Sequence, residues 1–188
     1  VLENVVLTDA LECCWHCRNA KLRGVQAEHG DYLFMHGENI DVDGFRLNGN
    51  YSFQYCRNVV IRNAEIHSKD AFWNTEDVTV YDSVVDGEYL GWHSRNLRLV
   101  NCRISGTQAL CYAENLVLEN CTLGEDADLC FEYSSVHAEI KGRVHSVKNP
   151  RSGRIVAEEY GDIILDEHCK APANCSIETG KAQSGEAA

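Results

Sequence analysis

Asn58-Val59-Val60-Ile61 and Asp77-Val78-Thr79-Val80 show the same pattern nineteen residues apart, and this repeat decides the fold. At each return, an Asn or Asp is followed by a branched apolar residue at the next position and by another two positions later. The repeating polar positions are Asn39, Asn58, Asp77, Asn96 and Asn115. A fixed period near twenty is typical of repeat architectures, in which each unit packs only on its neighbours.

Each unit divides into three short pieces, all too short for helices. The first is the apolar-x-apolar step, the second resembles Ala64-Glu65-Ile66, and the third resembles Ala71-Phe72-Trp73-Asn74. The first two alternate as half-buried strands do. Asn, Asp and Gly lie between the pieces, as expected of corners. We therefore predict a parallel β-helix of about eight coils, with the asparagines forming a bonded ladder along one corner.

Two other repeat folds share parts of this pattern. A left-handed hexapeptide helix has a strict six-residue rhythm, which the unequal pieces here do not follow. Leucine-rich repeats place an asparagine after the strand in a longer, leucine-dense unit, and that arrangement is absent. Both fit less well than the parallel β-helix.

The domain boundaries follow from where the repeat weakens. Residues 1–168 are expected to form the β-helix and residues 169–188 a loose polar tail. Val1-Leu2-Glu3-Asn4 reads as the close of a coil already under way. We therefore expect coils or a cap upstream of Val1.

Composition argues against several classes of partner. The 188 residues carry a net charge of −12, which disfavours nucleic acid and anionic membranes. No apolar run is long enough to span a bilayer. No phosphate-binding loop or nucleophile motif is present, and we expect no cofactor.

Cys102 and Cys121 recur at the repeat spacing, as do Cys111 and Cys130, so we expect core thiols in a cytoplasmic protein. Cys13-Cys14-Trp15-His16-Cys17 is the exception, because Cys-x-x-Cys beside a histidine is half of a zinc site. No second half with matching spacing follows. We therefore predict no metal.

The third piece of each coil is rich in aromatic residues, and neighbours on a strand face opposite sides. We favour an arrangement in which Trp73 and Trp92 join a buried Cys111–Cys130 column. In that arrangement Phe53, Phe72, Tyr55, His93 and Tyr112 face outward. The alternative buries the Phe72–Leu110 column and exposes both tryptophans. Either way an aromatic stripe is exposed, which suits a carbohydrate or a protein partner. The candidate ligand-binding residues are Trp73, Trp92, Tyr55, Phe72 and Tyr112.

Ionisable residues beside this stripe are candidates for catalysis: Asp70, Glu88, His93 and Glu132. Asp70 and Glu88 fall in adjacent coils, and strands stack about 4.8 Å apart. Their carboxylates could thus approach the separation of roughly 5–9 Å that glycosidases use. The competing interpretation is that they are ordinary surface carboxylates among the 29 acidic residues, and that His93 is a packed histidine.

Several strings carry a resemblance to a known family: Gly49-Asn50-Tyr51-Ser52-Phe53, Ser68-Lys69-Asp70-Ala71-Phe72-Trp73-Asn74, Gly87-Glu88-Tyr89-Leu90-Gly91-Trp92 and Phe131-Glu132-Tyr133-Ser134. From Asn39 to Leu165 the chain resembles a bacterial family known only as a domain of unknown function. The resemblance implies a pectin-lyase-like, right-handed parallel β-helix. It implies no activity, and the catalytic strings of polygalacturonases are missing.

Three hypotheses for function remain, and whether the chain is an enzyme stays open. We favour a non-catalytic solenoid that binds a carbohydrate or a protein through its aromatic face. The second hypothesis is a carbohydrate-active hydrolase or polysaccharide lyase that uses the carboxylates named above. The third is a purely structural repeat domain.

Overall fold

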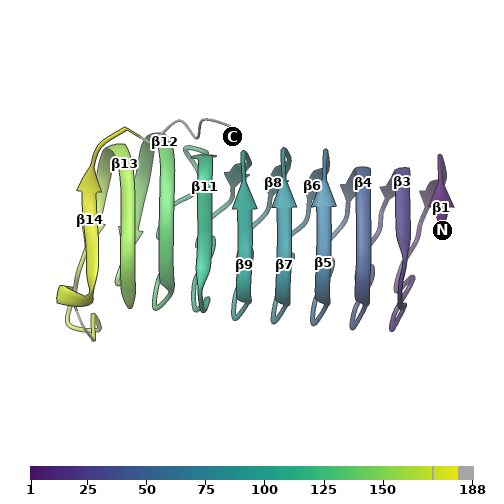
Figure 1. Ribbon diagram of the computed structural model, residues 1–188, viewed down its shortest axis with the longest axis horizontal. Coiled ribbons are helices and arrows are strands. Elements are labelled where there is room, and N and C mark those ends of the chain that lie inside the picture. The colour runs from purple at the N-terminus through teal and green to yellow at the C-terminus, as the bar shows by residue number, and fades with distance from the viewer. Residues whose placement is uncertain (171, 182–188) are drawn as a thin grey trace, which may run out of the picture.

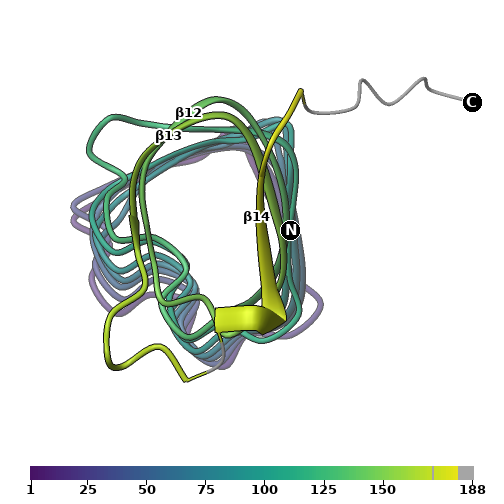
Figure 2. The ribbon, with the colours of Figure 1, turned by 90° about the vertical axis from the view of Figure 1, so that its left-hand side faces the viewer.

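The computed structural model describes residues 1–170 and 172–181 and shows a single parallel β-solenoid. Figure 1 shows the strands side by side along the long axis, in the order of the sequence. Seen along the stack in Figure 2, the coils superimpose around a common interior. The strands are β1 Leu2–Glu3, β2 Val6–Thr8, β3 Lys21–Glu28, β4 Glu38–Asn48, β5 Arg57–Arg62, β6 Glu65–His67, β7 Glu76–Tyr81, β8 Val84–Asp86, β9 Arg95–Val100, β10 Arg103–Ser105, β11 Leu116–Leu123, β12 Ser135–Lys148, β13 Ser152–Ile164 and β14 Cys175–Thr179.

The strand register confirms the nineteen-residue coil. Val59 of β5 pairs with Val78 of β7, which pairs with Leu97 of β9, all in parallel. These three side chains are fully buried. The stack has about nine turns, one more than the sequence predicted.

The repeating asparagine forms the expected ladder at one corner. Asn58 donates its side-chain N–H to Asn39 at 2.7 Å, and Asn96 donates to Asp77 at 2.8 Å. Asn96 also accepts from Asn115 at 3.1 Å. Asn58 has a φ of 51° and Asn96 a φ of 55°, which is left-handed backbone that asparagine tolerates well.

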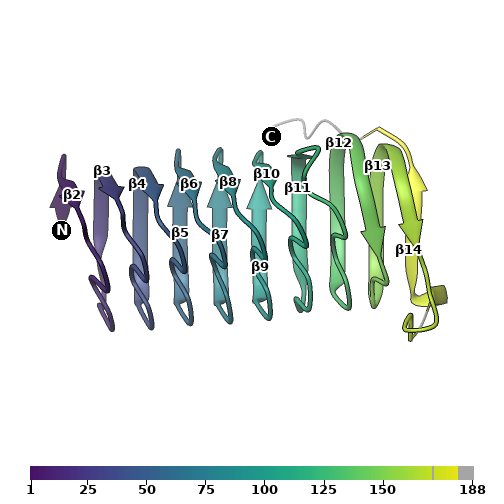
Figure 3. The ribbon, with the colours of Figure 1, turned by 180° about the vertical axis from the view of Figure 1, so that it is seen from behind.

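The third piece of each coil is a turn segment, so the expectation that its neighbouring residues face opposite sides as on a strand is wrong. Every second residue is left-handed, with φ values of 53° at Asp70, 60° at Phe72 and 53° at Asn74. Inter-coil hydrogen bonds nevertheless continue, from Phe72 N to Ser52 O at 3.0 Å and from Asn74 N to Trp92 O at 2.9 Å. Figure 3 shows these segments bending between the long strands of successive coils. We call this side of the solenoid the turn side.

The C-terminal boundary differs from the prediction. Cys175–Thr179 forms β14 and pairs in parallel with β13, after a 3₁₀ helix at Pro172–Asn174. The expectation of a loose tail is therefore wrong for this stretch. Residue 171 and residues 182–188, which the same expectation covered, lie outside the described residues.

Candidate functional site

The outermost positions of the turn side form a column of mostly aromatic residues, which we call the ring column. Its members are His16, His36, Tyr55, Asn74, His93, Tyr112 and Tyr133. The rings lie on one another: His36 and Tyr55 have centroids 4.9 Å apart at 19°, and His93 and Tyr112 are 5.0 Å apart at 25°. Because their faces are stacked together, the rings turn their edges outward. Asn74 interrupts the column between Tyr55 and His93.

A second column runs beside the first, two residues further along each coil. We call it the charge column, and its members are Arg18, Glu38, Arg57, Glu76, Arg95 and Glu114. Parallel pairing puts each member directly against the next. The sign of the charge alternates at every step.

Ion pairs connect most of the charge column. Glu76 binds Arg57 at 3.3 Å and Arg95 at 3.2 Å. Arg95 also reaches Glu114 at 3.7 Å, and Arg18 reaches Glu38 at 3.6 Å. These side chains remain substantially exposed, so they hold charge and donor capacity that a partner can use.

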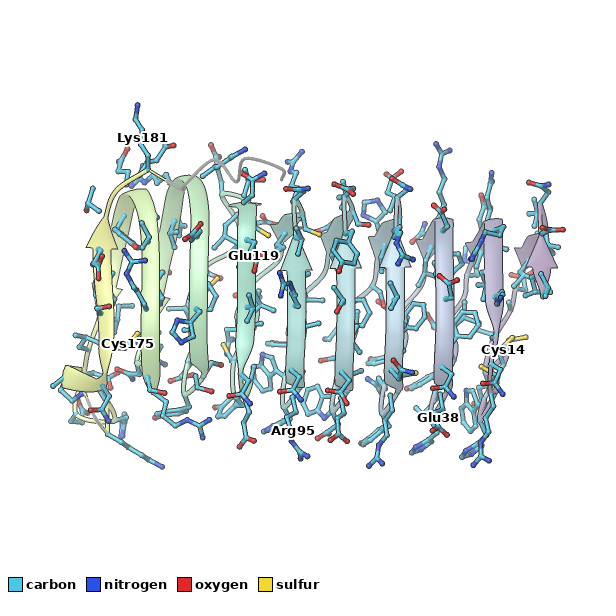
Figure 4. The ribbon with its side chains drawn as sticks, in the orientation of Figure 1. Cys14, Glu38, Arg95, Glu119, Cys175 and Lys181 are labelled. Atoms are coloured by element: carbon cyan, nitrogen blue, oxygen red, sulfur yellow. The ribbon has the colours of Figure 1, made fainter. Side chains whose placement is uncertain are left out.

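A shallow open groove of about 420 Å³ lies between the two columns. Asn74, which interrupts the ring column, and Thr75 are among its lining residues. In Figure 4, Glu38 and Arg95 point out along the same edge of the stack. The groove is lined by His36, Gly37, Glu38, Tyr55, Arg57, Asn74, Thr75, Glu76, His93 and Arg95.

The favoured orientation of the aromatic residues is corrected by the structure. Phe53 and Phe72 are fully buried, so neither faces outward and Phe72 is not a surface residue. Trp73 and Trp92 are half-buried on the turn side, and their ring centroids are 5.4 Å apart. Alternation along a strand was the wrong rule, because every second residue of the segment has a positive φ and the segment is a turn, not a regular strand.

The two cysteines assigned to the tryptophan column also separate. The N–H of Phe131 bonds to the carbonyl of Ala109, so Phe131 aligns with Leu110. Cys130 therefore aligns with Ala109, and Glu132 takes the place beside Cys111. Both cysteines are fully buried, as expected of core thiols.

Of the other predicted ligand-binding residues, Tyr55 and Tyr112 both belong to the ring column. Tyr55 is 43% exposed and Tyr112 is half-buried. The ring centroids of Trp92 and Tyr112 are 5.0 Å apart, and Trp92 donates its indole N–H to the carbonyl oxygen of Gln108 at 2.7 Å. The aromatic surface is thus real, but it comprises ring edges.

The four catalytic candidates do not form one cluster. Asp70 and Glu88 do lie in adjacent coils, with Asp70 N bonded to Glu88 O at 2.8 Å. Glu132 lies two coils further along and pairs with Lys148 at 3.0 Å. His93 belongs to the ring column and stacks on Tyr112. Glu88 pairs with Lys69 at 3.4 Å.

Asp70 is the most unusual of these carboxyls, since only 8% of the residue is exposed. Burial raises the pKa of Asp70; the Lys69 charge partly offsets this, and the Glu88 charge adds to it. A raised pKa is useful to a general acid, but a second carboxylate and an open substrate site are also required.

The cysteine-rich segment near the N-terminus shows no metal geometry. Within residues 1–170 and 172–181, no three His, Cys, Asp or Glu side chains group as metal ligands do. Burial, with smaller effects of Cys13 and Cys17, raises the pKa of Cys14 to about 12. Protonated thiols are poor ligands and poor nucleophiles. Among the same residues, no helix has the length and apolar character needed to cross a membrane.

The sequence reasoning missed the charge column entirely. Its signal is present in the sequence, because Glu38, Arg57, Glu76, Arg95 and Glu114 are each nineteen residues apart and alternate in sign.

Comparison with known families gives a match. A family described as a protein of unknown function, DUF3737, matches residues 1–178. The chain belongs to that family. The match extends into β14 as far as Glu178, which supports counting this strand with the solenoid of the DUF3737 chain. No curated protein matches the sequence.

Proposed function

We propose that this DUF3737 chain is a non-catalytic binding module that contacts a protein partner along its ring and charge columns. The observation that carries the proposal is the pairing of stacked, edge-exposed rings with exposed charges of alternating sign. Aromatic residues and arginine are enriched in protein–protein interfaces. On the edge formed by the two columns, the ring column contributes one residue per coil and the charge column contributes an arginine in every second coil.

The ring geometry favours a protein over a sugar. Sugars bind aromatic side chains mainly through the ring faces, whereas His36, Tyr55, His93 and Tyr112 use their faces to stack on one another. The side chains and backbone of a polypeptide readily contact ring edges, a tyrosine hydroxyl and fixed charges.

Carbohydrate binding is the second candidate, and the gap at Asn74 favours it. There the rings of Tyr55 and His93 are separated by an amide side chain that lines the groove. A single sugar unit could lie against Tyr55 and bond Asn74 and Glu76.

The ion pairs weigh against catalysis as the main function. Glu88 and Glu132 are each held by a lysine, at 3.4 and 3.0 Å. The remaining carboxyl, Asp70, is largely buried outside the groove lining. A pectin-lyase-like ancestry, a bacterial source and a cytoplasmic location remain parts of this proposal. Ten unbridged cysteines are compatible with such a reducing compartment.

The experiment is affinity capture with the tagged full chain from the producing cells, run in parallel with a glycan array. We expect a protein retained by wild type and lost with Arg57→Glu or Tyr55→Ala. Arg98→Glu is the matched control, because Arg98 is an exposed, ion-paired arginine of β9 on a strand side. Equal retention by all four chains, or Tyr55-dependent binding of a glycan without any protein, would contradict the proposal.

A further inference from the structure

The order of the charges along the charge column has a symmetry that the ion pairs within a single copy do not require. From Arg18 to Glu114 the signs run plus, minus, plus, minus, plus, minus. Read from the other end, the sign at every position is reversed. The six members are one coil apart, about 4.8 Å each. The column is therefore complementary in charge to its own antiparallel copy and repels a copy in parallel, unshifted register.

A two-fold axis makes the match explicit. The axis lies in the contact plane, perpendicular to the stack, and passes between Arg57 and Glu76. It puts Arg57 opposite Glu76 of the second copy and Glu38 opposite Arg95. Arg18 then meets Glu114. Each pair occurs twice, as in any isologous dimer, so all six positions face an opposite charge.

The ring column obeys the same axis. Because it lies on one side of the charge column, the two-fold brings the two ring columns together. Tyr55, whose residue is 43% exposed, then faces Asn74 of the second copy, which is where a ring is missing. Thus the protruding ring of each copy lies over the gap in the other.

Net charge makes this edge the favourable place for two copies to meet. The chain carries −12 overall, so most faces of two copies repel. The charge column has three arginines and three glutamates and is neutral. Complementary charges steer association and fix register more than they add affinity.

We propose that the protein partner of the ring and charge columns is a second copy of this chain, bound antiparallel about the axis between Arg57 and Glu76. This inference rests on the proposed function, whose partner it names.

Sedimentation equilibrium of the full chain, from low-micromolar to near-millimolar concentration, tests the dimer. We expect a reversible monomer–dimer equilibrium for wild type. Arg57→Glu puts glutamates opposite one another twice, and Glu76→Arg does the same with arginines. Each should weaken the dimer by about tenfold or more, because unlike contacts become like ones. Arg98→Glu should leave the equilibrium unchanged.

Mixing the two variants is the decisive arm. One Arg57→Glu chain and one Glu76→Arg chain restore an opposite charge at both central contacts. We therefore expect a heterodimer about as stable as the wild-type dimer, whereas each variant alone dimerises about tenfold or more weakly. Circular dichroism melts of each variant check that the fold is intact.

Several outcomes would overturn the inference. They are a wild-type monomer at every concentration, a mixture no more associated than its components, or an Arg57→Glu chain that dimerises normally. If the wild type is monomeric but still captures another protein through Arg57, self-association fails and the proposed function stands. If the wild type is monomeric and also captures no protein, both self-association and the proposed function fail.

Discussion

The strand sides and the turn side of each coil are built on different rules. On the strand sides, Val59, Val78 and Leu97 pair in register across three neighbouring strands. Along each strand, buried side chains alternate with side chains that are partly or fully exposed to solvent. On the turn side, every second residue has a left-handed backbone, and consecutive side chains such as Ala71 and Phe72 are both buried. A sequence repeat therefore predicts which residues share a column more reliably than it predicts whether that column faces the core or the solvent.

The largest expected effect tests whether the turn side is packed as tightly as the strand sides. Phe72→Ala removes a fully buried ring that lies 5.6 Å from the ring of Phe53. We expect it to lower the free energy of unfolding by about 3–5 kcal/mol, comparable to Ile61→Ala in β5. Urea denaturation measures both.

Phe72→Leu is the matched control, because Leu110 occupies the equivalent place two coils on. It should recover most of the loss. A cost for Phe72→Ala well below that of Ile61→Ala would mean that the turn side is loosely packed.

The second effect tests the left-handed backbone itself. Gly91 has a φ of 68°, and a Cβ there would lie 2.9 Å from Leu97 Cδ2. Gly91→Ala should cost about 1–3 kcal/mol through conformational strain and crowding. Gly142→Ala separates the two causes, since its φ is 75° but nothing lies within 4 Å. Equal losses at the two glycines would assign the whole cost to φ.

Most of the strand architecture could be predicted from the sequence, because period-two alternation and nineteen-residue spacing survive in Val59-Val60-Ile61 and its equivalents. The orientation of the aromatic residues could not. Asp and Asn are common at left-handed positions, so Asp70 and Asn74 carry a weak local signal, but Phe72 between them carries none. That conformation is maintained by inter-coil hydrogen bonds, which a single coil does not have.

The candidate site could likewise be predicted only in part. Tyr55 is exposed and Tyr112 is half-buried, which suits the polar tips of their rings. Phe72 is fully buried, because a rule for strands does not hold in a turn segment. The insertion before Cys130 shifted that residue by two positions, which spacing arguments based on nineteen could not detect.

A third, smaller effect belongs to the corner between the two kinds of side. Asn96→Ala removes a bond to Asp77 at 2.8 Å and another from Asn115 at 3.1 Å. We expect a loss of about 1–2 kcal/mol in thermal or urea unfolding. Asn96→Gly keeps the left-handed backbone accessible and isolates the side-chain bonds; if it costs nothing, the ladder is not stabilising.

The smallest effect concerns a carboxyl on the turn side. Burial raises the pKa of Asp70, with Lys69 opposing and Glu88 adding. The folded state therefore binds a proton more tightly than the unfolded state, and this group's contribution to stability falls as pH rises through the two pKa values. Asp70→Asn should increase stability at neutral pH and flatten that part of the profile. Urea midpoints from acid to neutral pH measure it, and a destabilised variant would show that Asp70 is needed as a carboxylate.

The most direct test of the central claim, that the turn-side edge is the binding surface, is site-specific photo-crosslinking. Benzoylphenylalanine is placed at Tyr55 in one sample and at Arg98 of β9 in the other, and each full chain is irradiated in the producing cells. The account predicts intermolecular adducts from position 55 that map to the region of Asn74 of a second copy, and none of comparable yield from position 98. Equal yields from the two positions, or adducts only from position 98, would contradict it.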